Sequence, residues 1–507
     1  MRYSLYVLIS IFFIKSLSAQ KQVLSYSFEF EKSFLQKSDY DSYFLEDNTA
    51  PGFAFVLNDN KKAEYVLVDK NFKVKSKIQV AIDKTVFEIS EDYLGGTATN
   101  GVFNFVYKVN DKKAFAKDKI FCQLEIVNFN TGTISNKRAF EIPKEEKLLT
   151  SFSDNNRYFT ISCNDKASEI KLYMISPEGE PIVKVIPFTV PAGKDKDRKN
   201  ISGYLKNIKL VKYNEEPELS SVVQPAKLFS AANSLKLVIN DGDDPTHIFT
   251  INLPDFSTNE KFIEHSELID KGKTKAYINS FLYDSILFSI VLNKKDIRIG
   301  VYNTFNGALL KSHEINEDMN FGLFAQTPVF EQRYGKKVTE KDVDDIPKLI
   351  KALSKGTEGI TVYKNKTGQY ILTIGSYDLI PVSSGGSSSM SSGYWTGGGM
   401  AKNYAGTPTF QSSTYVWNYR PGAPYYTTTD AKHYKTTFFK MLLDPGSYKP
   451  APGKMPASVN AQIKNYTDET DNKAKATNQF ALVNGQYYGY YDKESTNYII
   501  EQIIIAK

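Results

Sequence analysis

The chain has 507 residues, of which 41% are hydrophobic and 24% charged, and it contains 33 Tyr and 33 Phe but only 7 Met. These proportions are ordinary for a folded protein, and so many aromatic side chains favour β-strands. The formal net charge is +6. It falls by two, to +4, without Arg2 and Lys15, which over such a length argues against a nucleic-acid-binding protein.

The N-terminal residues have the pattern of a secretory signal peptide. Arg2 supplies a positive charge, residues 5–14 form a short apolar run, and residues 16–19 are mostly small. No cysteine follows the run, so a lipoprotein is not expected, and no later stretch approaches the roughly 18 apolar residues of a membrane-spanning helix. We therefore expect residues 1–19 to be removed. The mature chain, without a transmembrane segment, is then secreted to the periplasm or associated with the outer membrane.

A repeated unit runs along the rest of the chain: an alternating apolar strand, a polar turn residue, and a second strand. Three pairs of these turn residues lie 48 positions apart, which is the length of one four-stranded blade. The sequence therefore predicts an all-β protein, a β-propeller of about seven four-stranded blades, with six or eight as alternatives. A β-sandwich or two smaller β domains would also alternate in this way. The turn residues are Asp69, Asn128, Ser176, Asp255, Asn303, Asp444 and Asp492.

We expect residues 20–507 to form a single propeller domain, with a strand in residues 24–30 pairing into the last blade. The insertions in this domain are residues 189–230, 316–358, 383–429 and 452–476. If each repeat unit is the last strand pair of its blade, three of these insertions join one blade to the next. The insertion 383–429 then joins the second and third strands of the sixth blade. In an up-and-down blade both kinds of connection emerge on one face, which marks the binding face.

Two short helices are predicted inside the insertions. Thr339 with Asp342 resembles a capping signal, and the apolar residues after it fall on one helical face. A second helix is predicted after Pro456, where three apolar residues align. The apolar residues are Ile346, Leu349, Ile350 and Leu353 in the first helix, and Val459, Ile463 and Tyr466 in the second.

The insertion 383–429 is rich in Gly, Ser and Tyr, has only Lys402 and Arg420 as charges, and contains both tryptophans. Gly and Ser give backbone freedom, while aromatic rings with polar tips dominate interface hot spots. The sequence therefore predicts a partner-binding loop, with a low-complexity loop that has no partner as the alternative. The predicted partner-binding residues are Tyr394, Trp395, Tyr415, Trp417, Tyr419, Arg420, Tyr425 and Tyr426.

No catalytic, metal-binding or cofactor site is predicted. The histidines, His247, His265, His313 and His433, stand alone, without a second ligand at zinc-site spacing. The acidic stretch 240–244 lacks the ligand spacing of a calcium loop and is expected to be a hairpin turn. The two cysteines, Cys122 and Cys163, lie on apolar strand faces. Buried free thiols are expected there, with a disulfide as the alternative that export would permit.

A family resemblance rests on Ser18, Ala19 and Gln20 at the end of the leader, on residues 53–69, and on the late run GQYYGYYDKESTNYII. These segments resemble uncharacterised secreted or periplasmic β-propellers of Gram-negative bacteria that use type IX secretion. Some of those proteins look like partners of outer-membrane assemblies, including the plug-like subunit of the type IX translocon. The resemblance implies a protein partner at the outer membrane.

Three functions follow from these observations. The first is a non-catalytic interaction protein of the cell envelope that binds a protein partner through one loop-rich face. The second is a carbohydrate-binding propeller that stacks a glycan on Trp395 and Trp417. The third is a hydrolase with a carboxylate site that the sequence does not reveal.

Overall fold

The structure is a computed structural model of the chain. The chain divides into two compact units, which are described separately: residues 1–187, 420–424 and 456–507 form unit 1, and residues 188–419 and 425–455 form unit 2. The prediction of one domain over residues 20–507 stays a prediction. The described residues are 20–28, 41–50, 52–58, 62–81, 92–109, 120–191, 199–211, 216–240, 242, 245–269, 277–318, 324, 328–334, 337–380, 401–402, 408–409, 433–453, 455–456, 458–470, 474–482, 485–492 and 494–504.

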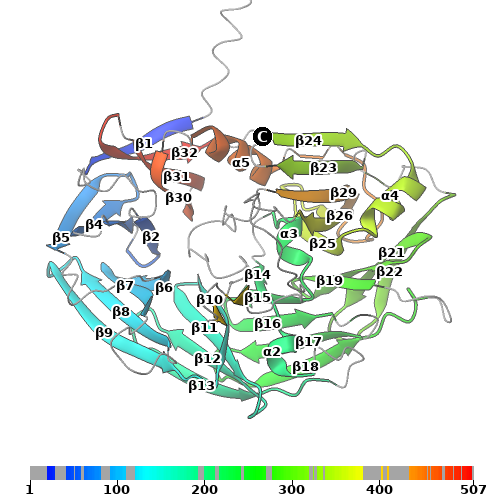
Figure 1. Cartoon of the computed structure of the whole chain (residues 1–507), viewed down its shortest axis with the longest axis horizontal. Helices are drawn as coiled ribbons and strands as arrows, with labels where there is room; N and C mark the ends of the chain where they lie inside the picture. The colour runs from blue at the N-terminus through cyan, green and yellow to red at the C-terminus, as the bar shows by residue number, and fades with distance from the viewer. Residues whose placement is uncertain are drawn as a thin grey trace, which may run out of the picture. The chain divides into compact units, whose positions relative to one another are not determined.

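Unit 1 contains four sheets of four antiparallel strands, each an up-and-down blade (Figure 1). Blade 1 is β2 (Asp41–Asp47), β3 (Gly52–Asn58), β4 (Lys62–Asp69) and β5 (Val74–Ala81). Blade 2 is β6 (Asp92–Thr99), β7 (Val102–Val109), β8 (Ile120–Asn128) and β9 (Thr133–Ile142). Blade 3 is β10 (Lys147–Asp154), β11 (Arg157–Asn164), β12 (Glu169–Ile175) and β13 (Pro181–Pro187). Blade 7 is β30 (Ala474–Leu482), β31 (Gly485–Asp492), β32 (Asn497–Ile503) and β1 (Gln20–Ser27).

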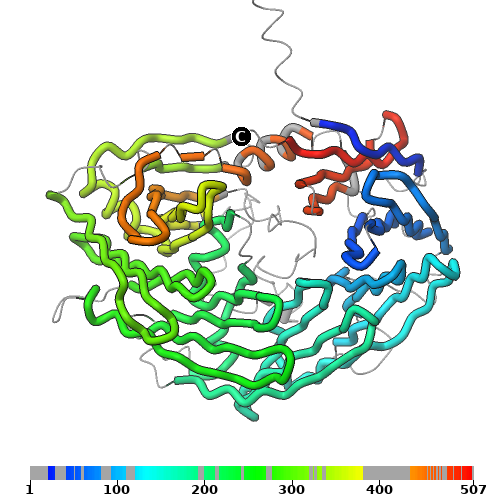
Figure 2. Tube along the Cα trace, turned by 180° about the vertical axis from the view of Figure 1, so that it is seen from behind, coloured from blue at the N-terminus to red at the C-terminus, as the bar shows by residue number. Residues whose placement is uncertain are grey.

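Blade 7 joins the two ends of the described chain. Strand β1 pairs antiparallel with β32, from Gln20 opposite Ile503 to Ser27 opposite Asn497, and the tube in Figure 2 shows these blue and red strands side by side. The predicted pairing of an N-terminal strand into the last blade is therefore confirmed. Because β1 is the fourth strand, the turn at Asp492 joins the second and third strands. The interpretation of this turn as part of a last strand pair was wrong.

Unit 2 contains three blades, two of which carry an additional strand. Blade 4 is β15 (Ala226–Ala231), β16 (Ser234–Ile239), β17 (Thr246–Asn252) and β18 (Thr258–Ile263), with the parallel strand β14 (Lys209–Val211) beside β15. Blade 5 is β19 (Tyr277–Tyr283), β20 (Ile286–Leu292), β21 (Asp296–Asn303) and β22 (Leu309–Asn316). Blade 6 is β25 (Thr357–Lys364), β26 (Tyr370–Leu379), β29 (His433–Leu443), β23 (Val329–Tyr334) and β24 (Lys337–Asp342). A short pair, β27 (Ala401–Lys402) and β28 (Pro408–Thr409), also belongs to this unit.

Blade 6 obtains its outer strands from earlier in the chain. The hairpin β23–β24 precedes β25, yet β23 pairs with β29, from Val329 opposite Phe438 to Tyr334 opposite His433. After the turn at Asp444 the described chain pairs with β29 only through an isolated bridge between Leu443 and Pro450. The insertion 316–358 therefore supplies strands of a blade rather than a loop alone, which the sequence pattern did not predict.

The turns confirm the predicted role of short polar side chains. At the third-to-fourth strand turns of several blades, an Asn or Asp side chain accepts hydrogen bonds from backbone amides two or three residues on, as Asp69 and Asn128 do. Asn100–Gly101, between β6 and β7, and Asn155–Asn156, between β10 and β11, have positive φ at both positions. That is the geometry of a type I′ hairpin turn, which Asn and Gly adopt readily.

The helices are short and differ in part from the prediction. They are α2 (Ile201–Tyr204), α3 (Leu219–Val222), α4 (Ile346–Leu353) and α5 (Val459–Thr470). The four apolar residues predicted for the first helix are buried in α4. Its start was predicted wrongly, because Thr339 lies in β24 and donates a hydrogen bond to the carbonyl of Gln332, while Asp345 precedes the helix.

Each unit has an apolar interior formed by strand faces that pack together. Unit 1 buries phenylalanine and tyrosine, with Phe44 stacked on Phe480 at a centroid distance of 3.8 Å. Unit 2 buries mainly Ile, Leu and Val from blades 4 to 6 together with α4. Within the described residues there are seven blades, each with four antiparallel strands, and two of them carry a fifth strand. The predicted fold class, a β-propeller of about seven four-stranded blades, is confirmed.

Candidate interaction site

All the predicted partner-binding residues lie outside the described residues, so their positions stay predictions. They are Tyr394, Trp395, Tyr415, Trp417, Tyr419, Arg420, Tyr425 and Tyr426. What the structure does describe is the pair of strands that carries their segment. Strands β26 and β29 pair along ten residues, from Tyr370 opposite Leu443 to Leu379 opposite Tyr434.

Side-chain contacts hold the ends of β26 and β29 that adjoin the segment 380–432. The ring of Tyr434 packs at a tilt against that of Tyr377, with centroids 5.3 Å apart, and its hydroxyl donates a hydrogen bond to Glu331 of β23. Thr436 donates a hydrogen bond of 2.8 Å to the carbonyl of Ser376. The segment between residues 380 and 432 therefore starts and ends on adjacent, firmly held strands of one sheet.

In unit 1, polar hairpin residues join one blade to the next. Asp47 accepts a 2.8 Å hydrogen bond from the amide of Gly101, and Thr49 accepts one of 2.8 Å from the amide of Asn100. Asn156 of blade 3 accepts a 2.7 Å bond from the amide of Ala98 in β6. Burial alone would raise the pKa of Asp47, but hydrogen bonds from backbone amides, first that of Gly101, lower it below its ordinary value. These residues are structural connections between blades 1, 2 and 3.

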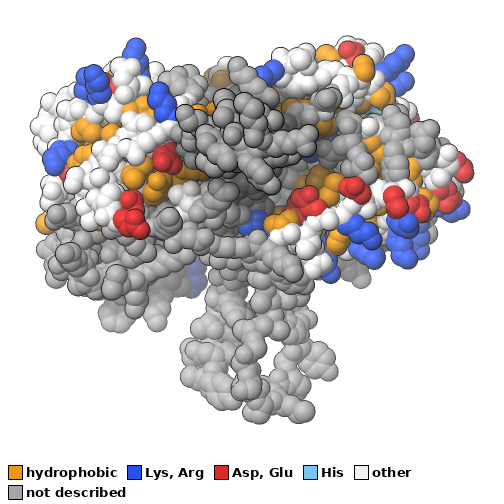
Figure 3. Space-filling view, turned by 90° about the horizontal axis from the view of Figure 1, so that it is seen from above, with side chains coloured by type: hydrophobic (Ala, Val, Ile, Leu, Met, Phe, Trp, Pro, Cys, Tyr) orange, Lys and Arg blue, Asp and Glu red, His pale blue; other side chains and the backbone are white. Residues whose placement is uncertain are grey.

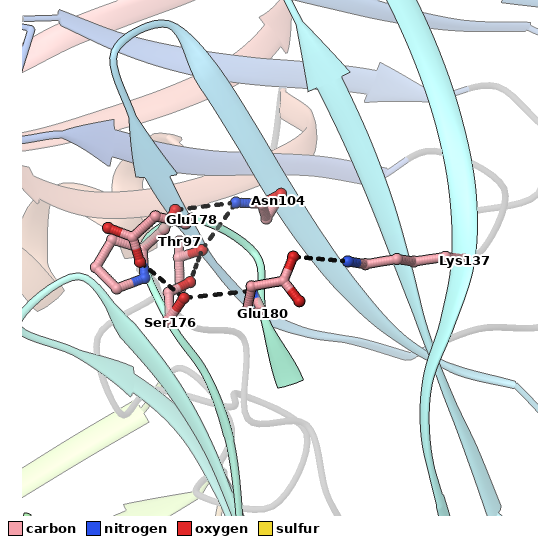
Figure 4. Close-up of polar contacts among 7 residues, drawn as sticks. Thr97, Asn104, Lys137, Ser176, Glu178 and Glu180 are labelled. Carbon is pink, nitrogen blue, oxygen red and sulfur yellow. Dashed lines mark hydrogen bonds and ion pairs between the residues drawn. The ribbon is translucent and has the colours of Figure 1, made fainter. Parts of the chain in front are cut away.

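The turn between β12 and β13 packs against blade 2 through a second polar cluster (Figure 4). Thr97 donates to the carbonyl of Ser176 at 3.0 Å, and the amide nitrogen of Asn104 donates to Thr97 at 3.1 Å. Ser176 itself donates to Glu178 at 2.8 Å. At the surface of this cluster, Glu180 forms an ion pair with Lys137 at 3.5 Å. The exposed ion pair contributes little, so the buried hydroxyl and amide contacts hold this turn.

Buried carboxylates of unit 1 accept hydrogen bonds from tyrosine hydroxyls. Glu125 accepts hydrogen bonds from Tyr65 and Tyr107, and burial raises the pKa of Glu125 and of both tyrosines. Glu146 accepts from Tyr173 at 2.8 Å and pairs with Lys171 at 2.6 Å. Similar Tyr–Glu pairs are Tyr26–Glu64, Tyr466–Glu501 and, in unit 2, Tyr434–Glu331. The only signal for them in the sequence is the high tyrosine count.

Two buried histidines of unit 2 are held in structural contacts. His247 lies 3.2 Å from the hydroxyl of Tyr204 and stacks on Phe262, and His265 lies 2.7 Å from the hydroxyl of Thr246. Burial lowers the pKa of His247 and of His265 to about 4, so both rings are neutral at physiological pH. Among the described residues no group of His, Cys, Asp and Glu side chains could hold a metal ion.

Strands β16 and β17 pair antiparallel up to Ile239 opposite His247, as a hairpin turn in residues 240–244 requires. Of that stretch the structure describes Asn240 and Gly242, and Gly242 has a φ of +65°. Asn240 is buried there and donates to Thr246 at 2.8 Å and to Ser280 at 3.1 Å. Its amide therefore connects blade 4 to blade 5 and is engaged in a structural contact.

The cysteines are buried free thiols, as expected, and the alternative of a disulfide is not realised. Cys122 lies on β8 and Cys163 on β11, and burial raises the pKa of both to about 12. A thiol with so high a pKa is a poor nucleophile at neutral pH.

The described surface mixes both charges. On the face in Figure 3, Lys and Arg side chains are interspersed with Asp and Glu, and hydrophobic side chains are scattered between them. Phe305 is the most exposed large hydrophobic residue in the described part of the chain, at 74%, and Lys261 lies over its ring. In the part of the chain that the structure describes, no helix has the length and apolar character needed to cross a membrane.

No protein-family model matches the chain, and no curated protein matches it. Among solved structures it is similar to the WD40 domain of SCAP from fission yeast, with 10% identity, a TM-score of 0.28, and coverage of 96% of this chain and 91% of that one. The Dos1 propeller is similar with 8% identity, a TM-score of 0.29, and coverage of 70% and 69%. A prolyl endopeptidase is matched with 12% identity and a TM-score of 0.29, and only 48% of its length is covered. Likenesses this weak carry no argument about function.

Proposed function

We propose that the protein is a non-catalytic β-propeller interaction protein of the cell envelope, which binds a protein partner through residues 383–429. One observation carries the proposal: a segment rich in Gly, Ser and aromatic residues is inserted between two long strands, β26 and β29, that pair directly. A blade needs only a short turn at this position. The added length therefore serves something other than the fold.

The composition of the segment suits recognition. Tyr and Trp give large contact areas with few rotatable bonds, and Gly and Ser let the backbone adapt to a partner. A long loop between fixed ends loses less entropy on binding than a free chain end, because closure has already restricted it. Trp395, Trp417 and Arg420 are of the residue types that most often contribute the largest binding energies.

The proposed location follows from the leader. Strand β1 begins at Gln20, directly after the predicted signal peptide of residues 1–19. Cleavage after Ala19 would thus leave the fourth strand of blade 7 intact. The expected partner is a protein at the outer membrane, as the sequence resemblance implies.

Affinity capture from native envelopes tests the proposal. Because Leu379 and Tyr434 are paired, deleting residues 383–429 leaves residues 380–382 and 430–432 as a hairpin loop that β26 and β29 can close. The full-length protein is expected to retain an outer-membrane protein that the deletion variant loses. A matched control replaces exposed Phe305 with Ala, which leaves the segment intact. Equal capture by the deletion variant, or capture of no protein by any form, would contradict the proposal.

A further inference from the structure

Three side chains on the inner strands of unit 2 end in buried polar atoms that have no hydrogen-bond partner among the described residues. They are the Nζ of Lys227 on β15, the Oδ1 of Asn279 on β19 and the Oγ1 of Thr361 on β25. Each of these residues has an exposed fraction of 0%. An unsatisfied buried donor or acceptor destabilises the fold, so three on the inner strands of blades 4, 5 and 6 need an explanation.

Asn279 and Thr361 lie beside the short helix α3. The amide nitrogen of Asn279 donates to the carbonyl of Val222, the last residue of α3, at 3.2 Å. A Cβ on Gly359 would lie 2.9 Å from the side chain of Val223, so this face of β25 packs closely on the end of the helix. Thr361, two residues further along β25, lies on the same face. Lys227 lies on β15 two residues before Phe229, and Asn279 lies on β19 two residues before Phe281. The rings of Phe229 and Phe281 pack at 5.2 Å, so the strand faces that carry Lys227 and Asn279 meet.

The hydrogen-bonding chemistry of the three atoms indicates which kind of molecule can bind between them. The amine of Lys227 donates hydrogen bonds, the Oδ1 of Asn279 accepts them, and the Oγ1 of Thr361 does both. A cation is disfavoured by the amine, and an anion is disfavoured by the carbonyl oxygen of Asn279. Water donates and accepts, and buried water typically makes about three hydrogen bonds to polar groups that the protein leaves unsatisfied.

We propose that Lys227, Asn279 and Thr361 form a buried hydration site, in which ordered water joins α3 to the inner strands of blades 4, 5 and 6. Burial lowers the pKa of Lys227 to about 7, and no charged group contributes to that shift. Lys209, beside it on β14, also has its pKa lowered by burial. The carboxylate of Glu216, in the segment between β14 and α3, is paired with Lys440 at 3.2 Å. The site thus holds an amine that no carboxylate neutralises.

A high-resolution crystal structure of the full chain tests the proposal, together with Lys227→Met and, as a control, Lys206→Met at an exposed lysine of the same unit. We expect an ordered water within about 3.2 Å of the Lys227 Nζ and of Asn279 or Thr361. It should be retained in Lys206→Met and lost or displaced in Lys227→Met. Direct bonding of Lys227 to a protein oxygen without water, a dry contact, or an ion at this position would overturn the proposal. Because methionine fills a similar apolar volume, the variant is expected to fold.

Discussion

Protonation of two buried histidines should make the protein unstable in mild acid. His247 and His265 are 1% and 2% exposed, and burial lowers the pKa of each from 6.5 to about 4. The unfolded chain takes up a proton at each ring near its ordinary pKa, while the folded chain resists it. The stabilising effect is therefore complete above about pH 6.5 and is lost as the pH falls towards 4.

The magnitude follows from linkage. With an unfolded pKa of 6.5 and a folded pKa of about 4, each histidine lowers the free energy of unfolding by about 2 kcal/mol at about pH 5. The complete loss, well below the folded pKa, is on the order of 3 kcal/mol for each residue. All four histidines belong to unit 2, so the loss is expected in that unit.

Urea unfolding followed by circular dichroism, at about pH 7.5 and about pH 5, measures the effect. A variant with His247→Gln and His265→Gln keeps hydrogen-bonding side chains but does not titrate. The wild type should lose about 4 kcal/mol more than this variant between the two conditions. Carboxylates titrate in both proteins, so the comparison cancels them. Equal losses in the two proteins would refute the argument that the buried rings resist protonation.

Three further outcomes are expected. Gly179→Ala, where a Cβ would lie 2.7 Å from the side chain of Asn104, should destabilise the protein by about 1–3 kcal/mol more in chemical denaturation than Gly132→Ala. Both positions have positive φ, but a Cβ at position 132 would have no other atom within 4 Å. Equal effects of the two substitutions would therefore contradict the close packing at Gly179. Lys227→Met should raise stability at about pH 7 by up to about 5 kcal/mol. Lys227 has a pKa of about 7 in the folded chain and 10.5 in the unfolded chain, so between these pH values the unfolded chain binds a proton that the folded chain does not. That advantage should shrink as the pH rises towards 10.5, and a constant advantage in thermal melts would contradict it. Burial raises the pKa of Tyr65 well above 10, so Tyr65→Phe should reduce the loss of stability above about pH 10 in alkaline unfolding curves, and an unchanged slope would show that this hydroxyl ionises freely.

Local patterns in the sequence predicted the blades well. An Asn or Asp side chain accepts amide hydrogen bonds from its own turn, so positions such as Asp69 and Asn128 could be recognised without knowing the fold. Strand alternation placed Cys122 and Cys163 on buried faces for the same reason. These features depend on residues close together in the chain.

Such local patterns could not predict which distant parts of the chain pair with each other. Thr339 resembles a helix cap, but it lies in β24, because the hairpin β23–β24 adds to a strand about one hundred residues further along the chain. The contacts of Tyr65 with Glu125, and of Asn279 with Val222, join residues 60 and 57 positions apart. No periodicity in the sequence marks such pairs. The partner-binding residues predicted in 383–429 lie outside the described residues, so that prediction rests on composition and on the strands that carry the segment.

The affinity of the purified protein for the outer-membrane partner that it captures is the most direct test of the proposed function. Replacing Trp395 and Trp417 together with Ala should weaken binding by at least about 30-fold, because interface hot spots contribute about 2 kcal/mol or more. Phe305→Ala, at an exposed aromatic residue outside the segment, should bind like the wild type. If the double variant binds as tightly as the wild type, the segment 383–429 is not the docking element and the central claim is wrong.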